Sequence, residues 1–183
     1  MTPRRQALLF VLVVVGQLLA LGAVVAQREH LLQTGERVRL RCRPVDPRSI
    51  LSGDYVELTY LISELHDAEL RRLGGGERFD RGDTVYVALR RDPGEPAHHA
   101  VALSHRRARL PADAVLLRGI VRAAWTDYVQ IRYGVEHYFV PQSEGERLER
   151  KLGDTVVEVA VSRRTGESGI VRLFVAGEEV RFY

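Results

Sequence analysis

The sequence contains one cysteine and one lysine in 183 residues, Cys42 and Lys151. A single cysteine excludes an internal disulfide framework and a zinc site built from thiolates. Because lysine is so rare, arginine carries nearly all the positive charge, and its planar guanidinium favours carboxylates and phosphates. The net charge is only +3, without the clustered excess of a nucleic-acid-binding domain. We therefore expect no nucleic-acid partner.

An uncharged apolar segment occupies residues 7–26, soon after Arg4 and Arg5. Twenty helical residues rise about 30 Å, which is the thickness of the hydrocarbon core of a bilayer. The preceding arginines favour a cytoplasmic tail over residues 1–6 and export of residues 27–183. We therefore expect a single-pass membrane protein, with lipid around the anchor and an extracytoplasmic domain after it.

A cleaved signal peptide is the alternative to a retained anchor. Val24 and Ala26 stand at the small-residue positions that precede a signal-peptidase cut, and such a cut would release a soluble protein beginning at Gln27. The uninterrupted length of the apolar segment favours the anchor.

One face of the predicted anchor helix carries small residues. Gly16, Ala20 and Ala23 fall on this face, and Gln17 lies beside them. Small residues let membrane helices approach closely, and a glutamine forms hydrogen bonds across such a contact. Gly16, Gln17 and Ala20 are therefore candidates for contact with an integral membrane partner, although this spacing is common in spans rich in alanine and glycine.

Beyond the anchor, short segments alternate apolar and polar residues, which indicates β-strands. In the first of them, residues 37–43, the side chains of Val38, Leu40 and Cys42 share one face. This pattern predicts that Cys42 is a small apolar core residue and not a nucleophile.

The other face of this first strand is basic. It carries Arg37, Arg39 and Arg41. Between residues 28 and 48, six arginines stand against three acidic residues, an excess equal to the net charge of the whole chain. This charge favours contact with anionic lipid headgroups or with an acidic loop of a partner. A solvated strand face is the alternative.

The remaining pattern predicts a mostly β fold. Further strands are expected at residues 55–62, 84–90, 99–105, 114–121, 128–133, 155–162, 170–176 and 179–183, with a hairpin connection at 162–169. Helices are expected at residues 63–76 and 143–153, from acidic residues early, basic residues late and a closing glycine. Together these elements indicate an antiparallel sandwich or barrel-like domain with one or two short helices, preceded by one transmembrane helix.

The tetrapeptide Gly-Asp-x-Val occurs three times, beginning at Gly53, Gly82 and Gly153. Glycine tolerates a positive φ in a turn, and the aspartate accepts hydrogen bonds from nearby backbone N–H groups. A β-branched residue then starts the strand at the same offset. The three copies are therefore interpreted as turns that open strands.

The first copy also carries two tyrosines. The residues of interest are Gly53, Asp54, Tyr55, Leu58 and Tyr60. Their spacing resembles the signature of the bacterial GDYXXLXY family, and residues 133–141 are similar to a second segment of that family. The resemblance implies a small protein of undetermined role that is tethered to the bacterial inner membrane and is commonly encoded beside, or joined to, a multi-spanning membrane protein. It assigns no catalytic residue.

A binding pocket is one hypothesis for this segment. It would be built around Asp54, Tyr55 and Tyr60, and would be ligand-binding or enzymatic. Aromatic residues later in the chain suggest a groove for a peptide or glycan, with Glu136 and His137 as its polar residues; core packing is the alternative. These aromatic residues are Trp125, Tyr128, Tyr133, Tyr138 and Phe139.

Other chemistries find little support. A membrane-anchored signal peptidase needs a serine activated by a lysine, but Pro44 stands near the serine position and Lys151 lies in a polar predicted helix. His99 and His105 share a strand face about 20 Å apart, too far to chelate one ion. No G-x-S-x-G motif occurs. We expect no metal and no cofactor, and an enzyme is less favoured than a binding protein.

Overall fold

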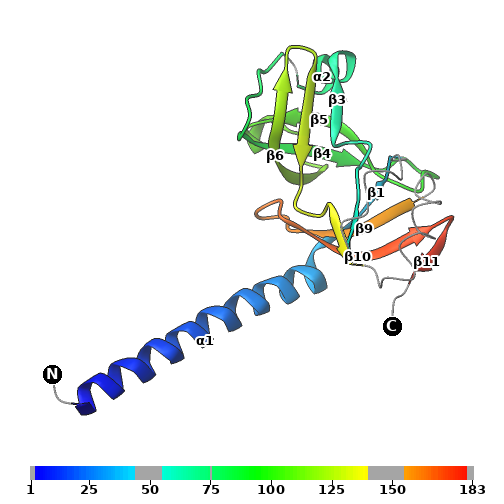
Figure 1. The fold of residues 1–183 in the computed structure, drawn as a ribbon. Coiled ribbons are helices and arrows are strands. Elements are labelled where there is room, and N and C mark those ends of the chain that lie inside the picture. Colours follow the sequence, from blue (N-terminus) through cyan, green and yellow to red (C-terminus); the bar gives the residue numbers. More distant parts are fainter. Residues whose placement is uncertain (1–2, 44–54, 75, 140–154, 181–183) are drawn as a thin grey trace.

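The computed structural model describes residues 3–43, 55–74, 76–139 and 155–180, and Figure 1 shows a long helix that projects from a β-rich body. The helices are α1 (Pro3–Thr34), α2 (Asp67–Gly74) and the short 3-10 helix η2 (Arg107–Arg109). The strands are β1 (Glu36–Arg41), β2 (Tyr55–Glu57), β3 (Glu64–His66), β4 (Thr84–Arg90), β5 (His99–Ser104), β6 (Val115–Trp125), β7 (Tyr128–Arg132), β8 (His137–Phe139), β9 (Thr155–Val161), β10 (Ser168–Val175) and β11 (Glu178–Val180).

The described strands form antiparallel sheets. One sheet has the order β1-β9-β10-β11, and a curled five-stranded sheet has the order β3-β7-β6-β4-β5. Strands β2 and β8 pair separately as a two-stranded sheet. This arrangement confirms the predicted fold class, a mostly β antiparallel domain with two short helices and an apolar N-terminal helix.

Alternation along the strands builds a core shared by the sheets. In and just after β1, Val38, Leu40 and Cys42 are buried, with exposed fractions of 0%, 1% and 2%. These side chains belong to the same apolar cluster as residues of the five-stranded sheet, such as Val87 and Leu117. Burial of this apolar face fixes the register of β1 against β9, because a slip of one residue would turn the arginines inward.

The strand predicted over residues 114–121 is longer in the structure, where β6 continues to Trp125, and two further predicted elements differ more strongly. The strand expected over residues 55–62 ends at Glu57, because the chain turns away to pair with other strands. The helix expected over residues 63–76 begins only at Asp67: its first residues form β3 and pair with β7, which buries Leu65. Strand β8 and helix η2 were not predicted, and the expected helix at 143–153 lies outside the described residues.

Helix α1 passes into the domain without a linker. It continues to Thr34, and Gly35 alone separates it from β1. A Cβ atom on Gly35 would lie 2.9 Å from the Cβ atom of Ala160 in β9, so only glycine permits this close approach. Arg37 donates a hydrogen bond of 2.7 Å to the carbonyl oxygen of Leu32 and so satisfies part of the helix C-terminus.

A second contact fixes the end of α1 against β10. The guanidinium of Arg28 donates a hydrogen bond of 2.8 Å to the carbonyl oxygen of Ser168. A Cβ atom on Gly169 would lie 2.9 Å from Leu32 and 3.0 Å from Arg28, so both side chains lie directly on the strand backbone. The direction of the helix is therefore set by packing against β9 and β10.

Among the described residues, α1 is the one helix that is long and apolar enough to cross a membrane, and a signal sequence would meet the same test. Nearly all its large apolar side chains from Phe10 to Val25 are exposed, and none of the apolar window is buried in the domain.

Candidate functional site

The segment that begins at Tyr55 connects the three sheets. Its first part, β2, pairs with β8. It then forms a bridge between Tyr60 and Cys42, and the amide of Leu61 donates a hydrogen bond of 3.0 Å to the carbonyl oxygen of Arg41. Its last part, β3, pairs with β7. Residues 55–66 therefore contact each sheet in turn, which explains why they do not form one long strand.

Two buried tyrosines bind this segment to the turn between β7 and β8. The hydroxyl of Tyr60 donates a hydrogen bond of 2.5 Å to the carbonyl oxygen of Val135. In the opposite direction, the hydroxyl of Tyr133 donates a hydrogen bond of 2.6 Å to the carbonyl oxygen of Ile62. We call this reciprocal pair of hydrogen bonds the tyrosine clamp. Each tyrosine thus satisfies a backbone carbonyl on the other segment.

Glu136 organises the same turn. Its carboxylate accepts hydrogen bonds from the backbone amides of Tyr133 and Gly134, the latter at 2.9 Å. Its own carbonyl oxygen accepts a hydrogen bond of 2.6 Å from the amide of Leu58. Gly134 has a φ of +79°, a conformation that favours glycine. Glu136 is 7% exposed, so this carboxylate acts in the interior as a cap of the turn.

Burial controls the acid–base properties of the clamp. Desolvation raises the pKa of Tyr60 well above 10, with further contributions from Cys42 and Glu136. Desolvation also raises the pKa of Tyr133 well above 10, again assisted by Glu136. Burial raises the pKa of Cys42 to about 12, so the thiol stays protonated at neutral pH and lacks the thiolate that a nucleophile needs.

The family model described as GDYXXLXY protein matches residues 17–173. The chain belongs to the GDYXXLXY family. The matched range includes both segments that the tyrosine clamp joins, so the clamp lies within the part of the chain that defines membership. No curated protein and no solved structure matches this chain.

The clamp accounts for part of the GDYXXLXY signature. Leu58 and Tyr60 are both buried, and Tyr60 is hydrogen-bonded to backbone. Asp54 and the Tyr55 side chain lie outside the described residues, so the pocket predicted around them stays a prediction. His137 is exposed and lies opposite Glu57 in the β2–β8 pair.

Among the predicted aromatic residues whose side chains are described, Tyr133 lies apart from Trp125 and Tyr128. Tyr133 is in the core, whereas Trp125 is 64% exposed at the β6–β7 turn. The rings of Trp125 and Tyr128 are 5.4 Å apart, and the ring of His66 lies 5.1 Å from that of Tyr128. Core packing therefore explains Tyr133, while the rings of Trp125, Tyr128 and His66 form a separate cluster.

The remaining candidates lie along α1 and β1. Gly16, Gln17 and Ala20 are exposed on the helix. In β1, Arg39 forms an ion pair of 3.3 Å with Glu158. Arg37, as described, caps α1, and Arg41 is exposed at the strand end. The three arginines therefore have different environments, and only Arg41 has the freely exposed side chain that a contact surface needs.

The second Gly-Asp turn and His98 have structural roles. Gly82 has a φ of +95°, and the carboxylate of Asp83 accepts a hydrogen bond of 2.8 Å from the amide of Asp80. The Nδ1 atom of His98 accepts a hydrogen bond of 3.1 Å from the amide of Arg39. Among the described residues, no group of three or more His, Cys, Asp or Glu side chains is arranged to hold a metal ion.

Two adjoining clefts at the end of α1 were not predicted. One, of about 740 Å³, lies between α1 and the β9–β10 hairpin, and the other, of about 520 Å³, lies along β6 and β7. Both are lined by Arg28 and Glu167. Further arginines come from strands and turns far apart in the sequence, so no linear pattern of charge identified these clefts.

We predict that the tyrosine clamp stabilises the fold. Replacing Tyr60 or Tyr133 by phenylalanine leaves a buried carbonyl without its donor, and each change should lower the free energy of unfolding by about 1–3 kcal/mol. Because both hydrogen bonds hold the same two segments, the double variant should lose less than the sum. Thermal unfolding of the full-length protein in detergent measures these differences.

The control for this experiment is Tyr86→Phe. The Tyr86 hydroxyl forms no hydrogen bond with a described residue, and its ring packs against the Arg107 guanidinium 5.5 Å away. Its loss should change stability by no more than about 0.5 kcal/mol. A clamp variant as stable as this control would contradict the assigned role.

A second prediction concerns alkaline pH. The unfolded chain releases tyrosine protons near pH 10, whereas Tyr60 and Tyr133 retain theirs in the folded state. The folded state then binds more protons, so stability should fall as pH rises above about 10. The double phenylalanine variant should show a shallower decline between about pH 9 and pH 11. Equal slopes in wild type and variant would refute the proton linkage.

Proposed function

We propose that this GDYXXLXY protein is a membrane-tethered, extracytoplasmic binding protein of the bacterial inner membrane, and that it acts as an accessory to an integral membrane partner. The observation that carries the proposal is α1 itself. Its apolar surface is exposed around the helix, and its end is packed against the domain. A helix of this kind needs a nonpolar environment, and a bilayer supplies one.

The continuity of α1 supports a retained anchor. The helix extends through Val24, Ala26 and Gln27, where a signal peptide would be cut. A protease needs an extended backbone, whereas here the backbone is held in helical hydrogen bonds. Arg4 and Arg5 precede the apolar segment and support a cytoplasmic N-terminus with the β domain on the other side.

The small-residue face of α1 supports a helical partner. Nothing lies within 4 Å of a Cβ atom placed on Gly16, so this face is open to another helix. Gln17 beside it supplies both a donor and an acceptor. Because α1 is fixed to β9 and β10, a contact made in the membrane would also orient the β domain. This coupling suits an accessory protein that must face its partner on one side.

We predict that a photo-crosslinking residue at Ala20 of the full-length protein captures one integral membrane protein in native membranes. The same residue at Leu18, about 200° around the helix, should not capture it. The intact mass of the purified chain should correspond to a start at Met1, because the anchor is retained.

The matched control uses two glycines of α1 with equally open surroundings, Gly16 and Gly22. Gly16→Leu should abolish capture, because leucine holds the helices apart, whereas Gly22→Leu, about 240° around the helix, should preserve it. A chain beginning at Gln27 would refute the anchor. Capture that is indifferent to both substitutions would refute the proposed helix contact.

A further inference from the structure

The two clefts at the end of α1 concentrate positive charge. Arg28, Arg118, Arg163 and Arg164 are among their lining residues, with Arg81, Arg122 and Arg132 on the side of β6 and β7. The acidic residue that lines them is Glu167. Seven arginines against one glutamate give an excess of six positive charges, whereas the whole chain has a net charge of +3. The rest of the chain is therefore net negative, so the positive charge of the protein is concentrated at these clefts.

Some of these arginines are paired with acidic residues, and three others are free to bind a ligand. Arg118 forms an ion pair of 3.2 Å with Glu167, and Arg163 forms one of 2.8 Å with Glu36. In contrast, the exposed side chains of Arg81, Arg122 and Arg132 form no hydrogen bond or ion pair with any described residue. A phosphate group would satisfy such guanidinium donors, because its oxygens match their fork geometry.

The clefts lie where the apolar segment ends. The first is lined by Val24 of the apolar segment and by Arg163 and Arg164 of the β9–β10 hairpin, so the hairpin tip stands beside the last turns of that segment. Arg28 is two residues beyond Ala26, a rise of about 3 Å. The headgroup layer of a bilayer is roughly 5–8 Å deep on each side, so Arg28 falls within it.

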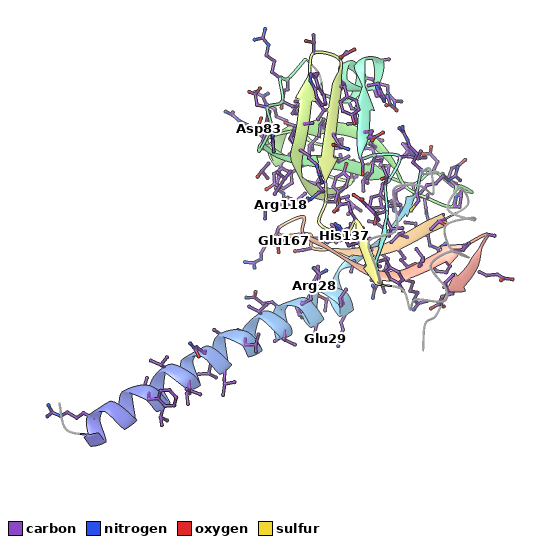
Figure 2. All side chains as sticks on the ribbon, in the orientation of Figure 1. Arg28, Glu29, Asp83, Arg118, His137 and Glu167 are labelled. Atoms are coloured by element: carbon purple, nitrogen blue, oxygen red, sulfur yellow. The ribbon has the colours of Figure 1, made fainter. Side chains whose placement is uncertain are left out.

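The arginine-bearing side of the domain is turned toward the anchor. Figure 2 shows Arg118, Glu167 and Arg28 in succession along the side of the domain from which α1 leaves. Ile120, 49% exposed, lines the second cleft between these charges and lies opposite Arg132 in the β6–β7 pair. Basic side chains around an apolar one suit the interface between headgroups and acyl chains.

From these observations we propose that the two clefts bind the phosphodiester headgroups of anionic phospholipids in the membrane that holds α1. This inference rests on the proposed membrane anchor, but it does not require the helical partner. Lipid is favoured over an acidic protein segment because the site stands at headgroup depth, where lipid phosphates surround the anchor. Bound headgroups would hold this side of the domain at the membrane surface.

The test uses full-length protein in nanodiscs that contain equal amounts of phosphatidylglycerol and phosphatidylcholine. Native mass spectrometry counts the lipids that stay bound when the protein is released. The wild type should retain phosphatidylglycerol in preference to phosphatidylcholine. The triple variant Arg81→Gln, Arg122→Gln and Arg132→Gln should reduce this preference by about a hundredfold, the scale expected for three arginines close to an anionic surface.

The matched control removes three exposed arginines that do not line these clefts, by Arg72→Gln, Arg78→Gln and Arg91→Gln. The control has the same net charge as the triple variant and should keep the wild-type preference. Circular dichroism should show the same fold for both, because none of the six side chains has a hydrogen bond or ion pair with a described residue.

The outcomes separate the two proposals. If the chain does not enter the nanodiscs, the proposed membrane anchor is wrong, and the lipid site that rests on it is wrong as well. A chain that enters without preference for phosphatidylglycerol, or a control that loses the preference as fully as the triple variant, would overturn the lipid site alone. If the triple variant keeps its lipid preference but no longer captures the membrane partner, the arginines serve an acidic protein surface and the lipid proposal is wrong.

Discussion

The structure depends on one constraint, namely that residues 55–66 must pair with three sheets at once. This segment meets β8, the end of β1 and β7 within twelve residues. Such a path leaves backbone groups at its corners that regular strand pairing does not satisfy, and buried groups of this kind are costly. The Tyr133 hydroxyl supplies a partner for the carbonyl oxygen of Ile62 in this segment. Tyr60 and the Glu136 carboxylate do the same for backbone groups of the β7–β8 turn that packs against it. Two tyrosines and one glutamate thereby hold the sheets around a common core.

This constraint also determines how the domain stands on its anchor. The sheet that receives α1 contains β1, β9 and β10, and the turn that carries the clamp touches it through a hydrogen bond from Ser168 to the carbonyl oxygen of Tyr133. Ser168 in turn accepts the hydrogen bond of Arg28. Contacts therefore run without interruption from the apolar helix to the five-stranded sheet. A domain mounted in this way presents a defined side to the membrane, and that side carries the arginine-lined clefts.

Much of the fold can be predicted from the alternation of apolar and polar residues, whereas the tyrosine clamp and the arginine-lined clefts cannot. Alternation places Val38, Leu40 and Cys42 in the core, and β4 has the predicted bounds, because each strand buries one face. The pattern fails at residues 58–66, where apolar residues continue but the backbone changes partners. It also cannot pair Tyr60 with Val135, since that contact spans 75 residues and depends on the assembled sheets. The arginine-lined clefts could not be predicted for the same reason, because their arginines come from five separate parts of the chain.

The central claim is that residues 57–62, which include Leu58 and Tyr60 of the signature, are held between the sheets and do not form a flexible loop. Hydrogen exchange of the full-length protein in nanodiscs, followed by mass spectrometry, tests it at residues 57–62. The account predicts that the amides of Leu58 and Leu61, which donate hydrogen bonds to the carbonyl oxygens of Glu136 and Arg41, exchange as slowly as those of β9, only when the whole domain unfolds. Exchange at the rate of the exposed hairpin tip at residues 163–165, while β9 stays protected, would contradict it.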